Sequence, residues 1–158
     1  AGAGVVIGVN KWDVAIEKKT SQRAFETDVR EHLKFLPWAP VVFLSARTGK
    51  GLSALFDAVD RVHAARGARV TTGELNRLLA RAAETNAPKA DKGNQPVRIL
   101  YGSQIGTAPP TFAVSINHPV DLHFSYRRYL ENRIRDAFGF EGTPIRLKVK
   151  HRPRKPRS

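Results

Sequence analysis

Two short apolar runs mark the first part of the hydrophobic pattern of this chain. They are residues 5–9 (VVIGV) and residues 41–44 (VVFL). Neither run alternates apolar with polar positions, which is typical of strands covered on both faces of a parallel sheet. The pattern therefore predicts two buried strands.

Two stripes of apolar residues at helical spacing follow these runs. The first predicts a helix from near Thr20 to Leu36, with Thr20 or Ser21 as its N-cap. The second predicts a helix from Leu52 to near Gly67. Strand, helix, strand, helix indicates a parallel α/β unit. Because about 67 residues are too few for a complete doubly wound domain, we expect earlier strands before residue 1.

Beyond residue 70 the pattern predicts a different order of elements. First comes a helix that follows Thr72-Gly73-Glu74, with Leu75, Leu78, Leu79 and Ala82 on one side. After it we expect a flexible loop at 86–96, strands at 97–104 and 111–117, a helix at 124–138 and a strand at 145–149. Helix, strand, strand, helix, strand indicates a compact α+β domain with a three-stranded sheet. We therefore divide the chain into an α/β part at 1–69, an α+β domain at 70–150 and a basic tail at 151–158.

Polar residues with distinctive chemistry come directly after each apolar run. The first run leads into Asn10, Lys11, Trp12 and Asp13, and the second run leads into Ser45 and Ala46. Ligands of open α/β sheets bind beyond the carboxyl ends of the strands, so these residues should lie near one another. Guanine presents its N1–H and its 2-amino group side by side, and a carboxylate accepts both. Adenine presents an acceptor at N1, so Asp13 would select guanine.

The other residues of this pattern have expected supporting roles. Asn10 offers an acceptor and donors, so it can bond the base edge and join neighbouring loops. The stem of Lys11 can lie along an aromatic face while its ammonium stays in water. We expect an N–H near Ala46 to donate to guanine O6 and the Ser45 hydroxyl to orient the Asp13 carboxylate. An ordinary polar loop between strand and helix is the alternative interpretation.

Composition limits the classes of site that the chain can hold. There is no cysteine, which excludes disulfides and cysteine zinc sites. The five histidines are scattered, so we expect no metal site. No apolar stretch approaches the roughly 20 residues needed to span a bilayer, and the N-terminus lacks a secretory signal. We therefore expect a cytoplasmic protein that does not contact a membrane.

The net charge of +13 is unevenly spread along the chain. Residues 1–69 hold 11 Lys and Arg against 7 Asp and Glu, whereas residues 70–158 hold 16 against 7. A field of this sign favours a polyanionic partner, most simply nucleic acid. A merely solubilising surface is the alternative. Since the excess lies outside the part with the guanine pattern, we expect the second half to carry RNA or ribosome binding.

The chain closely resembles the C-terminal part of the EngA/Der family of ribosome-assembly GTPases over nearly its whole length. In the first part, the residues that carry the resemblance are Asn10, Lys11, Trp12, Asp13, Ser45 and Ala46. In the second part they are Tyr101, Gln104, and residues 109–112 (PPTF), 125–133 (SYRRYLENR) and 140–144 (FEGTP). The run from Phe124 to Arg133 separates this family from other GTPases better than N-K-x-D does.

The resemblance implies a partial P-loop GTPase domain at 1–69 followed by a KH-like domain at 70–150. It implies a GTP hydrolase that acts in maturation of the large ribosomal subunit, with GTP or GDP and Mg²⁺ as ligands of the full-length protein. The implied partners are ribosomal RNA, the large subunit and upstream GTPase domains of the same protein, and we expect a monomer. Carried over by position, the residues that contact or support guanine are Asn10, Lys11, Asp13, Ser45 and Ala46.

The phosphate-handling motifs of such enzymes are not found in the GTPase part of this sequence. The loop G-x-x-x-x-G-K-[ST] does not occur in the chain, and residues 1–69 contain no D-x-x-G. Phosphoryl transfer depends almost entirely on these positioning elements. We therefore assign no catalytic residue, and expect no tight nucleotide binding and no measurable GTPase activity from this chain alone.

The second half contains a G-x-x-G sequence at residues 139–142, which is the spacing of the loop that clamps nucleotides in KH modules. It follows a predicted helix and precedes a strand, so we interpret it as a helix C-cap and turn. Helical spacing favours packing for Tyr126 and Tyr129. RNA contact, or contact with the GTPase domain, then depends on Arg127, Arg128, Arg133, Arg135, Arg152, Arg154, Lys155 and Arg157.

Three functions therefore stay open. The chain is part of a ribosome-assembly GTPase that is inactive alone, or an RNA- and ribosome-docking module without catalytic activity of its own. The third is an unrelated basic α+β interaction domain in which N-K-W-D is a coincidence.

Overall fold

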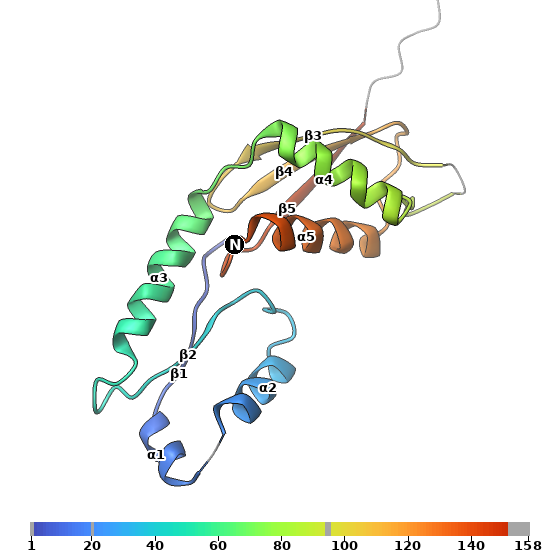
Figure 1. Ribbon diagram of the computed structural model, residues 1–158. Helices are drawn as coiled ribbons and strands as arrows, with labels where there is room; N and C mark the ends of the chain where they lie inside the picture. The colour runs from blue at the N-terminus through green and yellow to red at the C-terminus, as the bar shows by residue number, and fades with distance from the viewer. Residues whose placement is uncertain (1, 20, 94–95, 152–158) are drawn as a thin grey trace, which may run out of the picture. The chain divides into compact units, whose positions relative to one another are not determined.

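The computed structural model describes residues 2–19, 21–93 and 96–151, which form two compact units (Figure 1). The first unit contains Ala1–Arg66 together with Phe140–Pro144, and the second contains Gly67–Gly139 together with Ile145–Ser158. The chain thus passes between the units three times. The sequence-based division at 69/70 placed 140–144 in the second domain, whereas in the structure this segment is part of the first unit.

The first unit is built on two short parallel strands, β1 (Ile7–Val9) and β2 (Val41–Phe43). Ile7 lies opposite Val41 in their register. The helices of this part of the chain are α1 (Trp12–Glu17), α2 (Gln22–His32) and α3 (Leu52–Gly67). The sequence analysis predicted the order strand, helix, strand, helix for this region. It did not predict α1.

Helix α2 is shorter than predicted and ends at His32, not at Leu36. Leu33 leaves the helical conformation and the chain turns there, with the N–H of Leu36 donating to the carbonyl of Leu33 at 2.9 Å. The residue before a proline is disfavoured in the α region, and Pro37 comes next. Ser21 occupies the N-cap position without a side-chain capping bond, and Thr20 lies outside the described residues.

An aromatic cluster around Trp12 forms part of the core of the first unit. Trp12 is 5% exposed, and its ring centroid lies 4.5 Å from that of Phe43 and 5.7 Å from that of Phe25. Aromatic pairs at such separations prefer tilted or edge-to-face packing, as both pairs show here. The cluster joins the start of α1 to β2 and α2, and so fixes the loop between β1 and α1.

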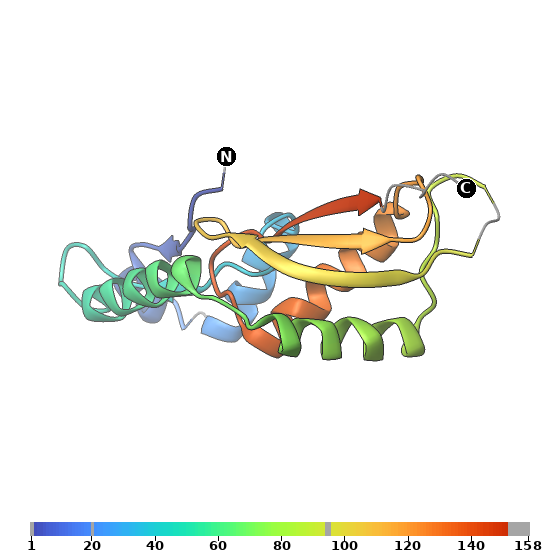
Figure 2. The ribbon, with the colours of Figure 1, turned by 90° about the horizontal axis from the view of Figure 1, so that it is seen from above.

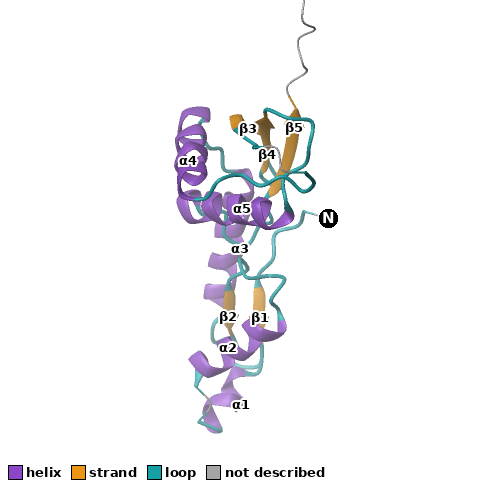
Figure 3. Ribbon diagram, turned by 90° about the vertical axis from the view of Figure 1, so that its right-hand side faces the viewer, coloured by secondary structure: helices purple, strands orange, loops and turns teal. Residues whose placement is uncertain are grey.

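The second unit has the predicted order of helix, strand, strand, helix and strand. These elements are α4 (Thr72–Thr85), β3 (Ile99–Gly106), β4 (Thr111–Ile116), α5 (Phe124–Phe138) and β5 (Arg146–His151). The sheet order is β3-β4-β5, with β3 antiparallel and β5 parallel to the central β4. Both helices lie on one face of this sheet (Figures 2 and 3).

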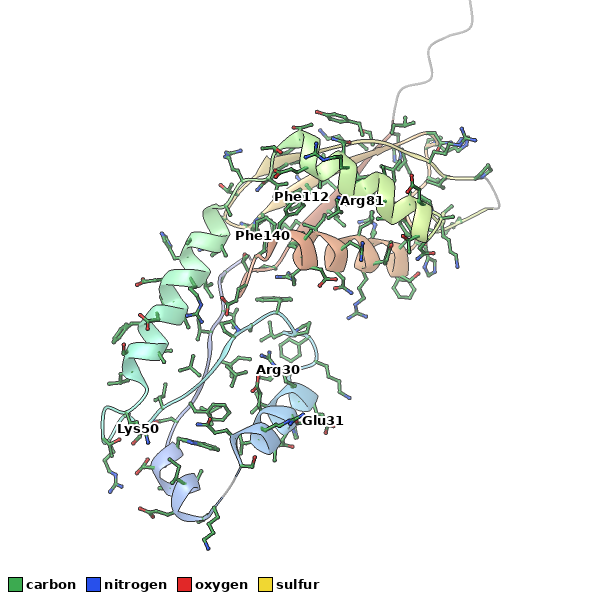
Figure 4. The ribbon with its side chains drawn as sticks, in the orientation of Figure 1. Arg30, Glu31, Lys50, Arg81, Phe112 and Phe140 are labelled. Carbon is green, nitrogen blue, oxygen red and sulfur yellow. The ribbon has the colours of Figure 1, made fainter. Side chains whose placement is uncertain are left out.

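Apolar side chains fill the space between the helices and that face of the sheet. Gly102 allows α4 to approach β3, because a Cβ there would collide with Leu79. Phe112 of β4, labelled in Figure 4, is fully buried. The core that this packing buries comprises Leu75, Leu78, Leu79, Ala82, Phe112, Val114, Ile116, Tyr126, Leu130 and Ile134. Thr71 and Glu74 form a capping box at the start of α4, which the sequence analysis did not identify.

The segment Phe140–Pro144 is held to the first unit by backbone hydrogen bonds. Gly142 donates to the carbonyl of Trp38 at 2.9 Å and accepts from the N–H of Val5 at 2.7 Å. Glu141 forms an ion pair with Arg61 at 3.1 Å. Gly139 ends α5 at a positive φ of 88°, so the G-x-x-G sequence is a helix C-cap and turn, as predicted. We call residues 140–144 the return segment.

None of the helices formed by the described residues is both long enough and apolar enough to cross a membrane.

Candidate guanine-binding site

Asn10 joins the loop after β1 to the loop after β2. Its side-chain oxygen accepts the N–H of Lys11 at 2.7 Å and the N–H of Ala46 at 3.0 Å. The N–H of Leu44 donates to Val9 at 2.9 Å, and that of Trp12 donates to Leu44 at 3.1 Å. These bonds bring the two sequence patterns together at the carboxyl ends of parallel strands. Asn10 therefore joins the two loops, as expected. The N–H of Ala46, which was expected to donate to guanine O6, donates to the Asn10 side chain in this structure.

Backbone conformation sets the direction of both loops. Lys11 is in the left-handed region with a φ of 59°, and α1 begins at the next residue. Gly51 has a φ of 83°, and a Cβ at that position would meet the carbonyl oxygen of Phe43. The loop between β2 and α3 also closes on itself, because Ser45 donates to the carbonyl of Lys50 at 2.8 Å.

Asp13 is held by a residue to which the sequence analysis gave no role. The Nε and Nη2 atoms of Arg47 donate to the Oδ2 atom of Asp13 at 3.1 and 2.6 Å. The Asp13 side chain is 16% exposed, whereas that of Arg47 is 75% exposed. In the sequence, this pair is indicated only by the position of Arg47 directly after Ser45-Ala46. A contact between Arg47 and Asp13 can be inferred only when the two loops are known to meet.

The surroundings of Asp13 favour its charged form. The Ser45 hydroxyl, followed by the Arg47 guanidinium, holds the pKa of the Asp13 carboxyl below its usual value. Ser45 is itself buried and receives the N–H of Thr48 on its hydroxyl oxygen at 3.3 Å. A carboxylate that stays ionised can accept two donors from one ligand edge.

A pocket of about 490 Å³ opens beside this carboxylate. The residues that line it are Asn10, Lys11, Asp13, Val14, Ser45, Ala46 and Arg47. All five residues predicted to read guanine therefore lie around one pocket. Its size suits a small ligand group, and its acceptors come from Asp13 and Asn10.

The donor set of the pocket fits a base edge and does not fit a metal ion. Within residues 2–19, 21–93 and 96–151, no group of three or more His, Asp or Glu side chains is arranged to hold a metal. Mg²⁺ prefers several oxygen ligands or phosphate oxygens, and Asp13 is the single carboxylate that lines the pocket. No phosphate or magnesium role is therefore assigned to these residues.

The arginines predicted to contact RNA on α5 differ in their surroundings. Arg127 forms an ion pair with Asp121. Burial lowers the pKa of Arg135, whose side chain is partly covered. Arg128 and Arg133 are exposed, and Arg133 lines a hollow of about 310 Å³ with Arg81 of α4. Arg81 is labelled in Figure 4. The predicted contacts Arg152, Arg154, Lys155 and Arg157 lie outside the described residues.

The two tyrosines of α5 are packing residues, as their spacing predicted. Tyr126 is 2% exposed, and burial raises its pKa to about 12. The hydroxyl of Tyr129 donates to the carbonyl of Ala82 on α4 at 3.1 Å. The ring of Tyr126 is therefore not presented for stacking on a base, and the hydroxyl of Tyr129 is held against α4.

Known proteins resemble both parts of this chain. Residues 69–150 match a family described as the KH-domain-like region of EngA bacterial GTPase enzymes, C-terminal. A protein named GTPase Der from Desulfitobacterium hafniense (strain DSM 10664 / DCB-2) is 45% identical over 152 residues, which are 96% of this chain and 34% of that protein. GTPase Der of Caldanaerobacter subterraneus subsp. tengcongensis is 43% identical over 151 residues, again 96% of this chain and 34% of the relative. The chain thus spans about a third of the length of these relatives.

Proposed function

Since this chain belongs to the EngA bacterial GTPase family through its C-terminal KH-domain-like region, we propose that it is part of a GTP-binding, GTP-hydrolysing protein that assists assembly of the large ribosomal subunit. The observation that carries the proposal is the pocket of the first unit, where Asp13, Asn10 and Ala46 meet, in a chain that also contains a KH-like domain. The proposal places the protein in the cytoplasm, where ribosomes are assembled.

The geometry at Asp13 supports guanine as the base. The carboxylate is ionised and already accepts two N–H groups from one planar guanidinium. Guanine offers the same kind of edge, with two donors side by side. A guanine base that enters the pocket would compete with Arg47 for Asp13, or would use the second carboxylate oxygen beside it.

The apolar side chains exposed on the first unit support the proposal that this unit is part of a larger GTPase domain. Parallel sheets are normally covered on both faces and contain more than two strands. Here Phe56 and Val59 of α3 are 65% and 46% exposed. We propose that further strands of the same GTPase domain cover this surface in the longer protein and supply the groups that hold the phosphates and Mg²⁺.

Replacing Asp13 by asparagine tests the proposed base selection. An amide presents a donor where the carboxylate presents an acceptor, so Asp13→Asn should lose guanine and gain xanthine, whose 2-oxo group accepts. Because an upstream GTPase domain with its own carboxylate would continue to hydrolyse GTP, the informative change is a gain: XTP hydrolysis by the full-length protein should rise by at least about 100-fold. Kinetics with both nucleotides measure the change.

The control for this test is Asp28→Asn on α2, which removes one carboxylate from an exposed site of the same unit. It should leave both activities unchanged. XTP hydrolysis that does not rise in Asp13→Asn would exclude a base-reading role for the pocket.

A second function, RNA or ribosome docking without catalysis by this chain, is favoured by the charge of residues 70–158. If α5 provides the contact, ribosomal RNA binding should weaken steeply with salt, and more after Arg127→Ala/Arg128→Ala than after Asp13→Ala. Binding titrations at several salt concentrations measure this. Equal effects of the two changes would remove α5 from the interface.

A further inference from the structure

The face of the three-stranded sheet that points away from α4 and α5 carries a regular row of cations. Along β5, the exposed residues Arg146, Lys148 and Lys150 alternate with the partly buried Leu147 and Val149. Residues two apart on a strand point to the same side and lie about 6.6 Å apart. The cations therefore form a row along the edge strand.

The strand register places small side chains beside this row. Thr111 is opposite Arg146, Ala113 is opposite Lys148, and Ser115 is opposite Lys150. In the pairing of β4 with β3, Ser115 is opposite Tyr101, and Ala113 is opposite Ser103. Each transverse row thus runs from β3 through a small residue of β4 to a cation. We call this surface the open face; its residues are Tyr101, Ser103, Thr111, Ala113, Ser115, Arg146, Lys148 and Lys150.

The opposite orientation of the neighbouring residues supports this assignment. Gly102 of β3 faces the Leu75 and Leu79 side chains of α4. Val114 is opposite Gly102 and is fully buried. Since strand residues alternate between faces, Tyr101 and Ser115 point away from the helices. Figure 2 shows both helices on the other side of the sheet.

The strands that form the open face carry cations and no acidic residue. Strands β3, β4 and β5 contain no Asp or Glu within their bounds. In the part of the chain that the structure describes, neither Lys148 nor Lys150 forms an ion pair. Their ammonium groups are thus available to a polyanion.

An exposed aromatic ring lies across the sheet from the cations. Tyr101 is 50% exposed, and its neighbour Leu100 is 45% exposed. Two strand spacings, about 10 Å, separate the backbone of Tyr101 from that of Lys150. A nucleotide spans a comparable distance from its phosphate to the far edge of its base. Surfaces for single-stranded nucleic acid combine cations that follow the backbone with aromatic rings on which bases stack.

We propose that the open face binds single-stranded nucleic acid, with phosphates along β5 and an unpaired base on Tyr101. A duplex has no unpaired base to place on Tyr101, and an acidic peptide would use the lysines without the ring. The site uses neither the α5 arginines nor the guanine pocket. It rests on the proposed RNA-docking function and names a different surface for it, so it can fail while docking through α5 holds.

Binding of a labelled single-stranded RNA of about 12 nucleotides to the chain tests the lysines. Lys148→Gln/Lys150→Gln removes two cations from the open face, whereas Arg77→Gln/Arg81→Gln removes two from exposed positions on α4. Each phosphate contact to a single strand contributes about 0.7 to the slope of log K against log salt. The lysine pair should therefore lower the slope by about 1.4, and the α4 pair should leave it unchanged.

The ring is tested by two substitutions that leave the charge unchanged. Tyr101→Ser should weaken binding by roughly 5- to 150-fold, because a stacked base is lost, and Tyr101→Phe should retain it. If circular dichroism shows that Lys148→Gln/Lys150→Gln does not fold, the Tyr101 variants still test the proposal.

Several results would overturn the proposal. One is equal weakening by the lysine pair and the α4 pair, which indicates diffuse attraction. Another is that a duplex RNA binds as tightly as the single strand. Equally tight binding of a polyglutamate peptide, with an affinity that Tyr101→Ser does not change, would have the same meaning. A third is loss of binding through Arg128→Gln/Arg133→Gln alone, which would assign the RNA to α5.

Discussion

At the scale of single residues, the contact between Asp13 and Arg47 helps to set the charge state of the carboxylate that we propose reads the base. The motif residues identify the carboxylate, but its charge state depends on neighbours from another loop. Ser45 and Arg47 both come from the segment after β2, and both lower the pKa of Asp13. The site is therefore prepared for donors before any ligand enters.

Replacing Arg47 should change the titration of Asp13. In Arg47→Ala the pKa of the Asp13 carboxyl should rise toward its ordinary value, because a hydrogen-bonding cation is lost. The lowered pKa means that the ionised form persists above it and is lost as pH falls through it. In the variant this loss should begin at a higher pH. A carboxyl ¹³C NMR titration of Asp13 measures the shift.

Arg47→Lys provides the matched comparison. Lysine keeps the charge but cannot donate through two nitrogens of one plane, so the pKa of Asp13 should rise less than in Arg47→Ala. An unchanged titration in both variants would mean that Arg47 does not contact Asp13 in solution.

At the scale of elements, the return segment shows how a short stretch is positioned by its backbone. Gly142 has a φ of 69°, is buried, and lies against Val5, Trp38 and Val62 of the first unit. A side chain at this position would meet Val62 and the carbonyl oxygen of Val5. The glycine therefore serves both the positive φ and the close approach.

Gly142→Ala should destabilise the chain by about 2–5 kcal/mol. The left-handed backbone costs a non-glycine residue about 1–2 kcal/mol, and the forced contact with Val62 adds about 1–3 kcal/mol. Denaturant unfolding measures the difference in free energy.

Gly49→Ala is the control for Gly142→Ala. Gly49 has a similar φ of 76°, but a Cβ there would meet no atom within 4 Å. Its cost should be the backbone cost alone, about 1–2 kcal/mol. Equal costs for the two variants would show that the return segment is not packed as described.

The elements themselves were predictable to different degrees. Helix α5 matches its predicted bounds, 124–138, because Tyr126, Leu130 and Ile134 repeat at helical spacing and Gly139 ends it. Helix α1 was missed because six residues are too short for periodicity to indicate a helix, and its one buried residue is Trp12. Strand β3 (99–106) begins and ends two residues later than the predicted 97–104, and β5 (146–151) begins one residue later and ends two residues later than the predicted 145–149. Their C-terminal ends lie further on because pairing with β4 continues past the apolar positions.

At the scale of the whole molecule, base recognition and most of the positive charge are assigned to different units. The guanine pocket lies in the first unit, whereas the cations of α5 and the open face lie in the second. Three passages of the chain connect the units. One continuous sequence thus carries two candidate binding activities with separate residues.

The chain by itself should show no Mg²⁺-dependent GTP hydrolysis. Its residues fit the base, and phosphoryl transfer requires groups around the phosphates and the metal that its sequence does not contain. Phosphate release by the purified chain, compared with that of a full-length relative, measures this. Hydrolysis that depends on Mg²⁺ and disappears in Asp13→Asn would contradict the expectation.

The sequence by itself determined the chemistry of the guanine pattern, the order of most elements and the uneven charge, because these depend on local residue types and spacing. It could not determine contacts between residues distant in the chain. The Arg47–Asp13 pair, the return of residues 140–144 to the first unit and the register that aligns Tyr101 with Lys150 all arise from tertiary packing. Such contacts depend on strand pairing and loop approach, which the local pattern of a single sequence does not specify.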